Sequence, residues 1–336
     1  MTIRKEVNNN NKKQNNVKEN EDDERPLLVN YNNKLYDIKK FVSKHPGGRK
    51  VLEKVAGSSI DKFMKGEERI MGVKHEHSEA AFEMLERYSL DQSFKKDALI
   101  DSNQPVMFEV GNLKEKYWRW IHEPYDGKLR LFKSDFLESL TNTKWWMIPA
   151  VWMPLVAYFA SNGLNLMYQM FGLSKGLSKG VLLASLLFTM GTLTWTLLEY
   201  SLHRGVFHWK PNPTSYNQIT FHFALHGLHH KTPMDGDRLV FPPTAALLII
   251  GFFYLFYRTF LPYSIFCCFC SGKLFGYICY DLIHYYLHHG RPRPTTNLHF
   301  RKVYHHNHHF KDFDAGYGIS TSLWDYIFNT EGSGPL

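Results

Sequence analysis

Four long apolar segments in the second half of the chain predict helices that cross a membrane. They cover residues 145–171, 181–202, 244–261 and 263–287, and each is close to the roughly 20 residues with which an α-helix spans a bilayer. Four crossings place the regions before the first segment, between the second and third, and after the fourth on one side of the membrane. The pattern therefore predicts an all-α membrane domain over residues 145–330, with its polar regions gathered on one face.

The residues before these segments divide into three parts. Residues 1–25 are rich in Asn and nearly devoid of apolar side chains, which predicts a disordered tail. Residues 26–90 contain two strand-like runs around a turn at Asn32, followed by helical patterns, which predicts a small α+β domain. Residues 91–144 predict a linker that becomes a helix on the membrane surface, because aromatic side chains such as Trp118 favour the bilayer interface.

Composition narrows the class of protein. The formal net charge is +8, but the basic residues are dispersed and no basic aromatic motif accompanies them, so we expect attraction to an anionic membrane surface and no nucleic-acid partner. The four Cys residues lie within residues 267–279, inside an apolar segment, where we expect small buried side chains.

Two features bear on the orientation of the chain in the membrane. The N-terminus is polar, so we expect no signal peptide. Basic residues flank the apolar segments. The polar regions are therefore expected to face the cytosol from a multi-pass position in the endoplasmic reticulum membrane.

Histidine is concentrated between residues 203 and 309, where 14 of the 18 His residues occur, most of them in four tight groups. Residues three or four apart share one face of a helix, so three of the groups are each expected to present imidazoles to a common point. The two residues of the first group are five apart, which predicts a bend or loop between them. Ten imidazoles result, enough for two metal ions, whereas His222, His289, His299 and His306 break the spacing and fit hydrogen-bonded core residues equally well. The groups are His203 and His208; His226, His229 and His230; His284 and His288; and His305, His308 and His309.

Residues 26–90 resemble cytochrome b5. The resemblance rests on Tyr36-Asp-Ile-Lys-Lys-Phe-Val, on His45-Pro-Gly-Gly, and on His77 with the Ser that follows it. It implies that His45 and His77 bind haem b from its two sides, with His75 as the alternative second ligand. Two axial ligands leave no open position on the iron, so this haem would carry electrons and not bind O₂. The apolar residues expected to wall the haem pocket are Leu52, Val55, Phe63, Met71, Phe82 and Leu85.

The haem domain also bears on which metal the other histidines bind. Neutral imidazole suits iron, zinc and copper alike. A one-electron carrier on the same chain implies a redox-active acceptor, and zinc has no redox chemistry. Two iron ions that activate O₂ are therefore expected for activity, although zinc could occupy such a site in purified protein. Long acyl chains are the substrate that a bilayer offers beside the site, which predicts an acyl-chain oxygenase.

The second half of the chain resembles the fatty acid 2-hydroxylases that carry a fused cytochrome b5 domain, within the fatty acid hydroxylase superfamily. The motifs are Trp120-Ile-His-Glu-Pro, His226-Gly-Leu-His-His-Lys-Thr-Pro-Met-Asp, Arg238-Leu-Val-Phe-Pro-Pro, Tyr280-Asp-Leu-Ile-His and Leu323-Trp-Asp. The resemblance implies a monooxygenase that hydroxylates carbon 2 of a long-chain fatty acid or of the acyl chain of ceramide, with electrons from cytochrome b5 reductase or cytochrome P450 reductase. The metal ligands that it carries over are His203, His208, His226, His229, His230, His284, His288, His305, His308 and His309.

Three alternatives share part of this pattern. A b5-fused acyl desaturase also binds iron through His groups, but its last group usually begins with Gln, whereas His305 begins it here. A sterol-modifying member of the same superfamily normally lacks the haem domain. A non-enzymatic metal carrier of the membrane would have no use for a haem domain.

Asp281 lies one turn before His284. It could orient the imidazole of that ligand, and a solvated or capping role is about equally expected.

Overall fold

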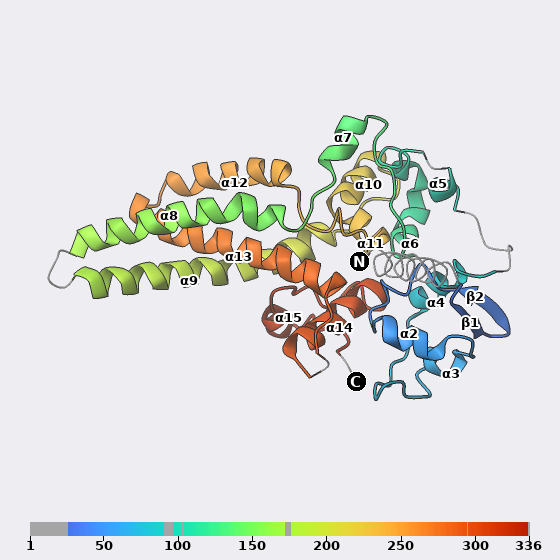
Figure 1. Ribbon diagram of the computed structural model, residues 1–336. Coiled ribbons are helices and arrows are strands. Elements are labelled where there is room, and N and C mark those ends of the chain that lie inside the picture. Colours follow the sequence, from blue (N-terminus) through green and yellow to red (C-terminus); the bar gives the residue numbers. More distant parts are fainter. Residues whose placement is uncertain (1–25, 91–96, 103, 172–175, 294, 335–336) are drawn as a thin grey trace, which may run out of the picture. The chain divides into compact units, whose positions relative to one another are not determined.

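The chain forms two compact units, which are described separately. The first includes most of residues 26–90, and the second begins near residue 97 and continues to the C-terminal region. Figure 1 labels the helices and strands of both units. The computed structural model describes residues 26–90, 97–102, 104–171, 176–293 and 295–334.

The first unit begins with a β-hairpin. Strands β1 (Leu28–Tyr31) and β2 (Lys34–Asp37) pair antiparallel, with the first residue of β1 opposite the last residue of β2. The two residues between the strands, Asn32 and Asn33, both have positive φ. This is the backbone conformation that a two-residue hairpin turn requires, and Asn adopts it more readily than most residues do.

Within residues 26–90, three short helices follow the hairpin: α2 (Arg49–Val55), α3 (Asp61–Met64) and α4 (Glu79–Glu86). The hydroxyl of the fully buried Tyr36 donates a hydrogen bond to Glu86 Oε1 at 2.6 Å, which ties β2 to the end of α4. The small α+β domain predicted from the sequence is confirmed. Its buried core consists of Val29, Tyr36, Ile38, Val55, Ile60, Met64 and Leu85.

The described part of the second unit contains three helices that are long and apolar enough to cross a membrane: α8 (Met147–Phe171), α9 (Gly176–Leu202) and α13 (Tyr263–His289). A fourth apolar helix, α12 (Pro243–Arg258), has 16 residues. At 1.5 Å per residue it measures about 24 Å, which is shorter than the roughly 30 Å hydrocarbon core of a bilayer. All four predicted apolar segments are therefore helical, but only three have the length of a spanning helix, so the predicted count of four crossings is not confirmed.

Helix α13 packs against both α8 and α9, and its contact with α9 is very close. A Cβ atom on Gly191 of α9 would lie 2.0 Å from the Phe269 carbonyl oxygen, and one on Gly272 of α13 would lie 1.9 Å from the Phe188 carbonyl oxygen. Only glycine allows the two backbones to approach so closely, as is usual where membrane helices pack through small residues. This contact fixes the rotation of α9 relative to α13, and hence the direction of the histidines at the ends of both helices.

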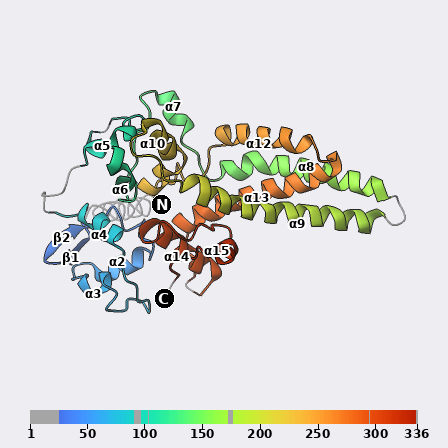
Figure 2. The same ribbon diagram turned by 180° about the vertical axis from the view of Figure 1, so that it is seen from behind.

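Short helices gather at one end of α8, α9 and α13, and we call them together the cap (Figures 1 and 2). Two of them are π-helical turns that extend an α-helix without a break. The cap comprises α5 (Ala98–Asp101), η1 (Val110–Lys116), α6 (Tyr117–Ile121), α7 (Asp135–Leu140), η2 (His203–Phe207), α10 (Tyr216–His222), η3 (Phe223–Gly227), α11 (Leu228–Lys231), α14 (Asn297–Phe310) and α15 (Leu323–Phe328).

Two buried lysines attach cap helices to their neighbours. Lys231, at the end of α11, donates hydrogen bonds to the carbonyl of Trp120 in α6 (2.9 Å) and to that of Glu123 just beyond α6 (2.7 Å). Lys302 of α14 donates to carbonyls in the last turn of α13, including that of Leu287 at 2.7 Å. A cation is favourable beside the carbonyl end of a helix, and each buried carbonyl left without a partner would cost about 1–3 kcal/mol. The two lysines therefore hold α11 against α6, and α14 against α13.

Candidate metal centre and haem site

The structure brings nine of the ten histidines predicted to bind metal into two buried or half-buried groups. Within each group, one ring nitrogen of every residue lies within 4.8 Å of those of all the others. The rings come from η2 and the residue that follows it, and from η3, α11, α13 and α14, so segments far apart in the sequence converge. Group A consists of His203, His208, His226 and His308, and group B of His229, His284, His288, His305 and His309.

A π-helical turn explains the five-residue spacing of the first two histidines. Turn η2 continues α9 directly, and the His208 N–H donates to the His203 carbonyl at 3.0 Å. In a π-helical turn, residues five apart lie on the same face of the helix. The ring centroids of His203 and His208 are 4.9 Å apart. The bend or loop predicted between these residues is wrong, because the helix instead widens to accommodate the extra residue.

Backbone carbonyls orient two rings of group A. His203 Nδ1 donates to the Tyr317 carbonyl at 2.6 Å, and His308 Nδ1 donates to the Ala315 carbonyl at 2.8 Å. A carbonyl only accepts hydrogen bonds, so in each neutral ring the proton is on Nδ1 and Nε2 offers a lone pair. His203 Nε2 lies 3.1 Å from His226 Nε2. His203 and His308 thus direct unprotonated Nε2 atoms toward the other rings of group A.

The tenth histidine, His230, lies beside both groups. Its Nε2 is 3.1 Å from that of His226 and 3.2 Å from that of His208, both in group A. Its ring centroid is also 4.4 Å from that of His309 in group B. By its Nε2 contacts, His230 belongs with group A.

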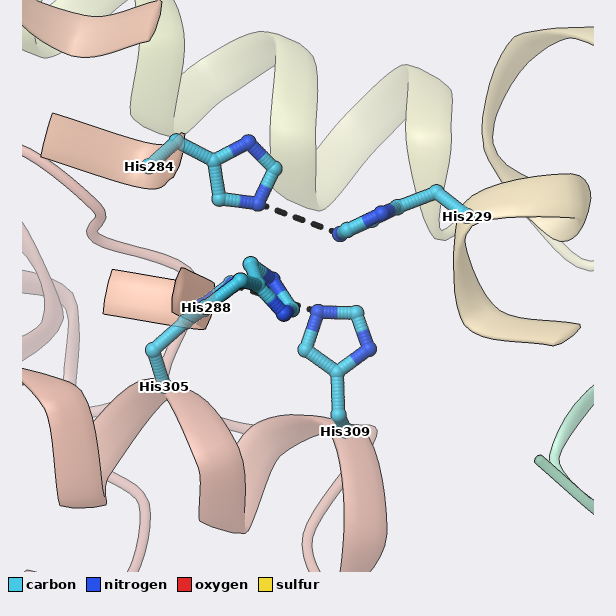
Figure 3. A group of neighbouring side chains, drawn as sticks. All are labelled: His229, His284, His288, His305 and His309. Carbon is cyan, nitrogen blue, oxygen red and sulfur yellow. Dashed lines mark hydrogen bonds between the residues drawn. The ribbon is translucent and has the colours of Figure 1, made fainter. Parts of the chain in front are cut away.

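Group B is formed by rings from three helices that face one another (Figure 3). His284 Nε2 of α13 lies 3.1 Å from His229 Nε2 of α11. His305 Nε2 of α14 lies 2.9 Å from His288 Nε2 and 3.2 Å from His309 Nε2. As in group A, the Nε2 atoms are the ones that converge.

Two histidines join a different group from the one that their spacing predicted. His308 belongs to group A, whereas its neighbours on α14, His305 and His309, belong to group B. On a helix, residues four apart, such as His305 and His309, differ in direction by only about 40°. His308 and His309 are adjacent in the sequence, so their directions differ by about 100° and His308 points to a different side. His229 likewise joins group B although His226 joins group A. The prediction that each triplet points to one common centre is wrong, and α11 and α14 each contribute to both groups.

The nitrogen atoms of each group fit metal ions better than they fit one another. A neutral imidazole has a single N–H, so close Nε2 pairs whose protons are on Nδ1 bring two lone pairs together. Protonation does not relieve this contact, because burial holds the pKa values of His229, His305 and His309 well below the usual range. Nitrogens placed about 2.0–2.1 Å from one ion are themselves about 3 Å apart, which agrees with the observed 2.9–3.2 Å.

The four histidines that break the spacing lie outside both groups of the described chain. His222 shares a 2.6 Å hydrogen bond with the Tyr117 hydroxyl, and His306 Nε2 donates to the Leu287 carbonyl at 3.2 Å. Both are the contacts of hydrogen-bonded core residues, one of the two interpretations that the sequence left open. The other two residues are His289 and His299.

One histidine that was not predicted to take part borders the centre. His122 follows α6, and its Nδ1 donates to the Trp118 carbonyl at 2.8 Å. Its ring stacks on Phe313 at 4.0 Å and lies 5.1 Å from the ring of His230. Burial lowers the pKa of His122 to about 4, so the ring is neutral and covers one side of His230. No helical spacing relates His122 to the other histidines, and its place in the Trp120-Ile-His-Glu-Pro motif was the one available signal.

Asp281 is buried one turn before His284. Its carboxylate lies near the hydroxyl of Tyr277 and the backbone of Phe241. A role for Asp281 in orienting a ligand imidazole stays a prediction.

In the first unit, His45 and His77 face each other as two ligands of one haem would. Their ring centroids are 6.4 Å apart and the ring planes differ by 24°, whereas imidazoles on opposite sides of one metal, each with a nitrogen about 2 Å from it, have centroids roughly 6 Å apart. Burial, followed by the charge of His75, lowers the pKa of His77 to about 4, so its ring is neutral and free to bind a metal. A Cβ atom on Gly47 would lie 2.8 Å from His45 Cε1, so this turn leaves room for the ring only because it carries glycine.

The apolar residues predicted to wall the haem pocket mostly share one core. Val55 and Leu85 are buried in it, and the half-buried Leu52, Phe63 and Phe82 pack against it. Met71 does not, since 55% of its surface is exposed.

Comparison with known families separates the same two regions. A family model for cytochrome b5-like haem/steroid binding domains matches residues 12–91, and the fatty acid hydroxylase family model matches residues 188–330. The chain is similar to a solved structure described as full-length scs7p with only the hydroxylase domain visible, with a TM-score of 0.61 and 35% identity, covering 72% of this chain and 91% of that chain.

Curated relatives match over most of the chain. It is 38% identical to a fatty acid 2-hydroxylase of Homo sapiens, with 88% of this chain and 89% of the relative covered. It is 33% identical to a ceramide very long chain fatty acid hydroxylase of Saccharomyces cerevisiae (89% and 88% covered) and 47% identical to a dihydroceramide fatty acyl 2-hydroxylase of Arabidopsis thaliana (69% and 92%). The chain therefore belongs to the fatty acid hydroxylase family, in the form that has a cytochrome b5-like domain before the hydroxylase domain.

Proposed function

We propose that this chain is a membrane-bound monooxygenase that uses O₂ to hydroxylate carbon 2 of long-chain fatty acyl groups, as free fatty acids or in ceramide. The observation that carries the proposal is the pair of adjacent all-histidine groups at the ends of the membrane helices α9 and α13. The names of the relatives support carbon 2 as the position and sphingolipid acyl chains among the substrates.

Groups A and B, with His230, would hold two metal ions. Bound iron would supply the one-electron chemistry that activates O₂, whereas zinc fits the same imidazoles without redox chemistry. Iron is the proposed metal because the cytochrome b5-like domain implies a haem that delivers single electrons. The proposed ligands are His203, His208, His226, His229, His230, His284, His288, His305, His308 and His309.

The depth of the two groups supports carbon 2 as the reacting position. His203 and the pair His284 and His288 lie in the last turns of helices that have the length and composition of membrane spans. These turns come where the hydrocarbon core ends, and carbon 2 of an acyl chain lies next to the polar carboxyl or amide group at that same boundary. A mid-chain carbon lies deeper in the bilayer. The chain's own residues would thus receive the head of the acyl chain and keep water away from it.

We also propose that α12 is a fourth crossing. His203 directly follows α9 and His288 lies in the last turn of α13. The two groups that contain them are adjacent, so both helices end on the same side. The chain must therefore return across the membrane between them, and α12 is the apolar helix in that interval. A helix of about 24 Å is compatible with a crossing where the bilayer thins locally.

The domain division that we propose has a tail at residues 1–25, which lie outside the described residues, a haem domain at 26–90, a linker with a membrane-surface helix at 91–144 and a hydroxylase domain at 145–330. Helix α7 supports the third part, because Phe136 exposes 70% of its surface close to the start of α8.

The proposed location is the endoplasmic reticulum membrane, with haem and histidines facing the cytosol. Cytochrome b5 reductase or cytochrome P450 reductase would supply the electrons.

The direct test of the activity is isotopic. Membranes from cells that make the chain, supplied with long-chain acyl lipids and ¹⁸O₂, are expected to yield 2-hydroxyacyl lipids that carry one ¹⁸O atom, measured by tandem mass spectrometry. Membranes that contain His308→Ala protein at the same level provide the blank. A hydroxyl at another carbon would contradict the proposed position, and a hydroxyl that takes its oxygen from water would contradict a monooxygenase.

A neighbouring pair on α14 separates a metal ligand from a bystander. His308→Ala is expected to reduce hydroxylation roughly 100-fold or more, because changes even to the partners of ligands reduce metal affinity or activity by about 10–100-fold, and to lower the metal content of the protein. His306→Ala should keep both metals and most activity, at a cost of about 1 kcal/mol in stability from the lost hydrogen bond to Leu287. Plasma emission and product analysis on the same purified samples measure both quantities. Equal loss of metal from both variants would show that the assignment to groups is wrong.

A second pair tests the haem. His77→Ala is expected to abolish the low-spin haem spectrum of the full chain and its reductase-driven turnover, while the metals of groups A and B remain at wild-type content. His75→Ala is the matched control, since His75 is two residues away and exposed, and it should retain both spectrum and turnover. The reverse result would make His75 the second ligand.

A further inference from the structure

Helix α15 (Leu323–Phe328) has its apolar residues on the outside. Leu323, Tyr326 and Ile327 expose 49%, 72% and 49% of their surfaces, and at 100° per residue they lie within an arc of about 100° on the helix. Asp325, on the opposite side, is fully buried. A helix on a water-covered surface shows the reverse arrangement, with charged residues outside and apolar residues inside.

The contacts of α15 place it at a definite level along α9. Trp324 Nε1 donates to Thr196 Oγ1 at 2.9 Å, and the Phe328 ring stacks on Tyr200 with centroids 5.4 Å apart. Lys179 begins the membrane-spanning segment of α9. At 1.5 Å per residue, Thr196 and Tyr200 are about 26 and 32 Å further along the helix, close to the roughly 30 Å thickness of the hydrocarbon core. Helix α15 therefore lies where that core ends.

Helix α15 contacts the part of α9 that follows a row of exposed apolar side chains. Leu182, Leu186 and Leu193 are exposed at helical spacing along α9, and Leu193 lies one turn before Thr196, the residue that Trp324 contacts. A bilayer that covers these leucines reaches the edge of α15. Trp and Tyr side chains are also the ones favoured at this level of a bilayer.

We propose that α15 is a membrane-interface helix that docks Leu323, Tyr326 and Ile327 into the leaflet on the side of the cap, and that this docking braces a histidine of group A. The partner is the lipid surface itself. The docking part rests on α9 being a membrane helix, and the bracing part rests on the proposed function of group A.

The buried side of α15 is connected to His203 by a series of hydrogen bonds. Asp325 accepts hydrogen bonds from the backbone N–H groups of Tyr317 (2.9 Å) and Gly318 (2.8 Å). The Tyr317 carbonyl in turn accepts the 2.6 Å hydrogen bond from His203 Nδ1. A Cβ atom on Gly318 would lie 2.7 Å from the carboxylate of Asp325, so the loop fits against this side chain without space to spare. The depth of α15 in the membrane is thus transmitted to the orientation of His203.

Spin-label accessibility tests the docking without any need for turnover. A nitroxide attached to Ile327→Cys in the full chain, reconstituted in phosphatidylcholine vesicles, is expected to collide more with O₂, which concentrates in the bilayer, than with a water-soluble nickel chelate. A label at Lys311→Cys, an exposed position at the end of α14, should show the opposite ratio. Wild-type protein treated with the same reagent corrects for any reaction of the four native cysteines.

Two results would overturn the docking. Greater collision with the nickel chelate at position 327 would mean that this face is in water. Protection from both reagents would mean that a second protein surface covers it.

The double variant Tyr326→Glu/Ile327→Glu tests the bracing. Hydroxylation of an acyl lipid embedded in vesicles is expected to fall several-fold relative to wild type, whereas the rate in detergent micelles and the haem spectrum stay unchanged, which shows that the variant is folded. Lys311→Glu, which adds negative charge elsewhere on the cap, is the matched control and should behave as wild type in both media. Wild-type rates of the double variant in vesicles would contradict the bracing. Because the spin-label ratio needs no activity, failure of the docking is distinguishable from failure of the proposed function.

Discussion

Buried imidazole nitrogens held about 3 Å apart are the constraint on which the rest of this structure depends. In group A, His203 Nε2 and His226 Nε2 are 3.1 Å apart, and the His203 proton is on the far side of its ring, at the Tyr317 carbonyl. A second nitrogen lone pair that faces the Nε2 lone pair of His203 is repelled, unless a proton or a cation lies between them. Free energy from metal binding would offset that repulsion, so metal binding and the folding of the cap are expected to be coupled.

The rest of the second unit holds these rings in place. The close contacts of Gly191 with Phe269 and of Gly272 with Phe188 fix α9 on α13. Lys231 and Lys302 fasten the cap helices through the carbonyls at the ends of their neighbours. Each device acts at a helix end or a helix crossing, where a small rotation would move an imidazole away from its group. The same helix ends close segments that have the length and composition of membrane spans, which supports the proposal of chemistry next to the head group of a lipid.

Much of this arrangement was predictable because the relevant signals are local. Apolar runs predicted the helices, Asn32 and Asn33 predicted the hairpin turn, and the four-residue spacing of His284 and His288 predicted that they share a face. The π-turn after α9 was not predictable, because a five-residue spacing alone does not distinguish a wide helical turn from a loop. The division of the α11 and α14 histidines between two groups depends on how the helices are rotated against α13, which is a property of tertiary packing. The early end of α12 is likewise a matter of local geometry, since Arg258 donates to the Leu261 carbonyl at 3.1 Å and the chain leaves the helix there.

X-ray anomalous scattering at the iron absorption edge, from crystals of the full chain loaded with iron, tests the central claim most directly. It is expected to show two separate peaks at the cap in addition to the haem iron, one enclosed by the Nε2 atoms of group A with His230 and the other by those of group B, each about 2 Å from its nitrogens. A single peak shared by both groups, or no iron within reach of these imidazoles, would contradict the account of a two-metal centre built from the ends of membrane helices.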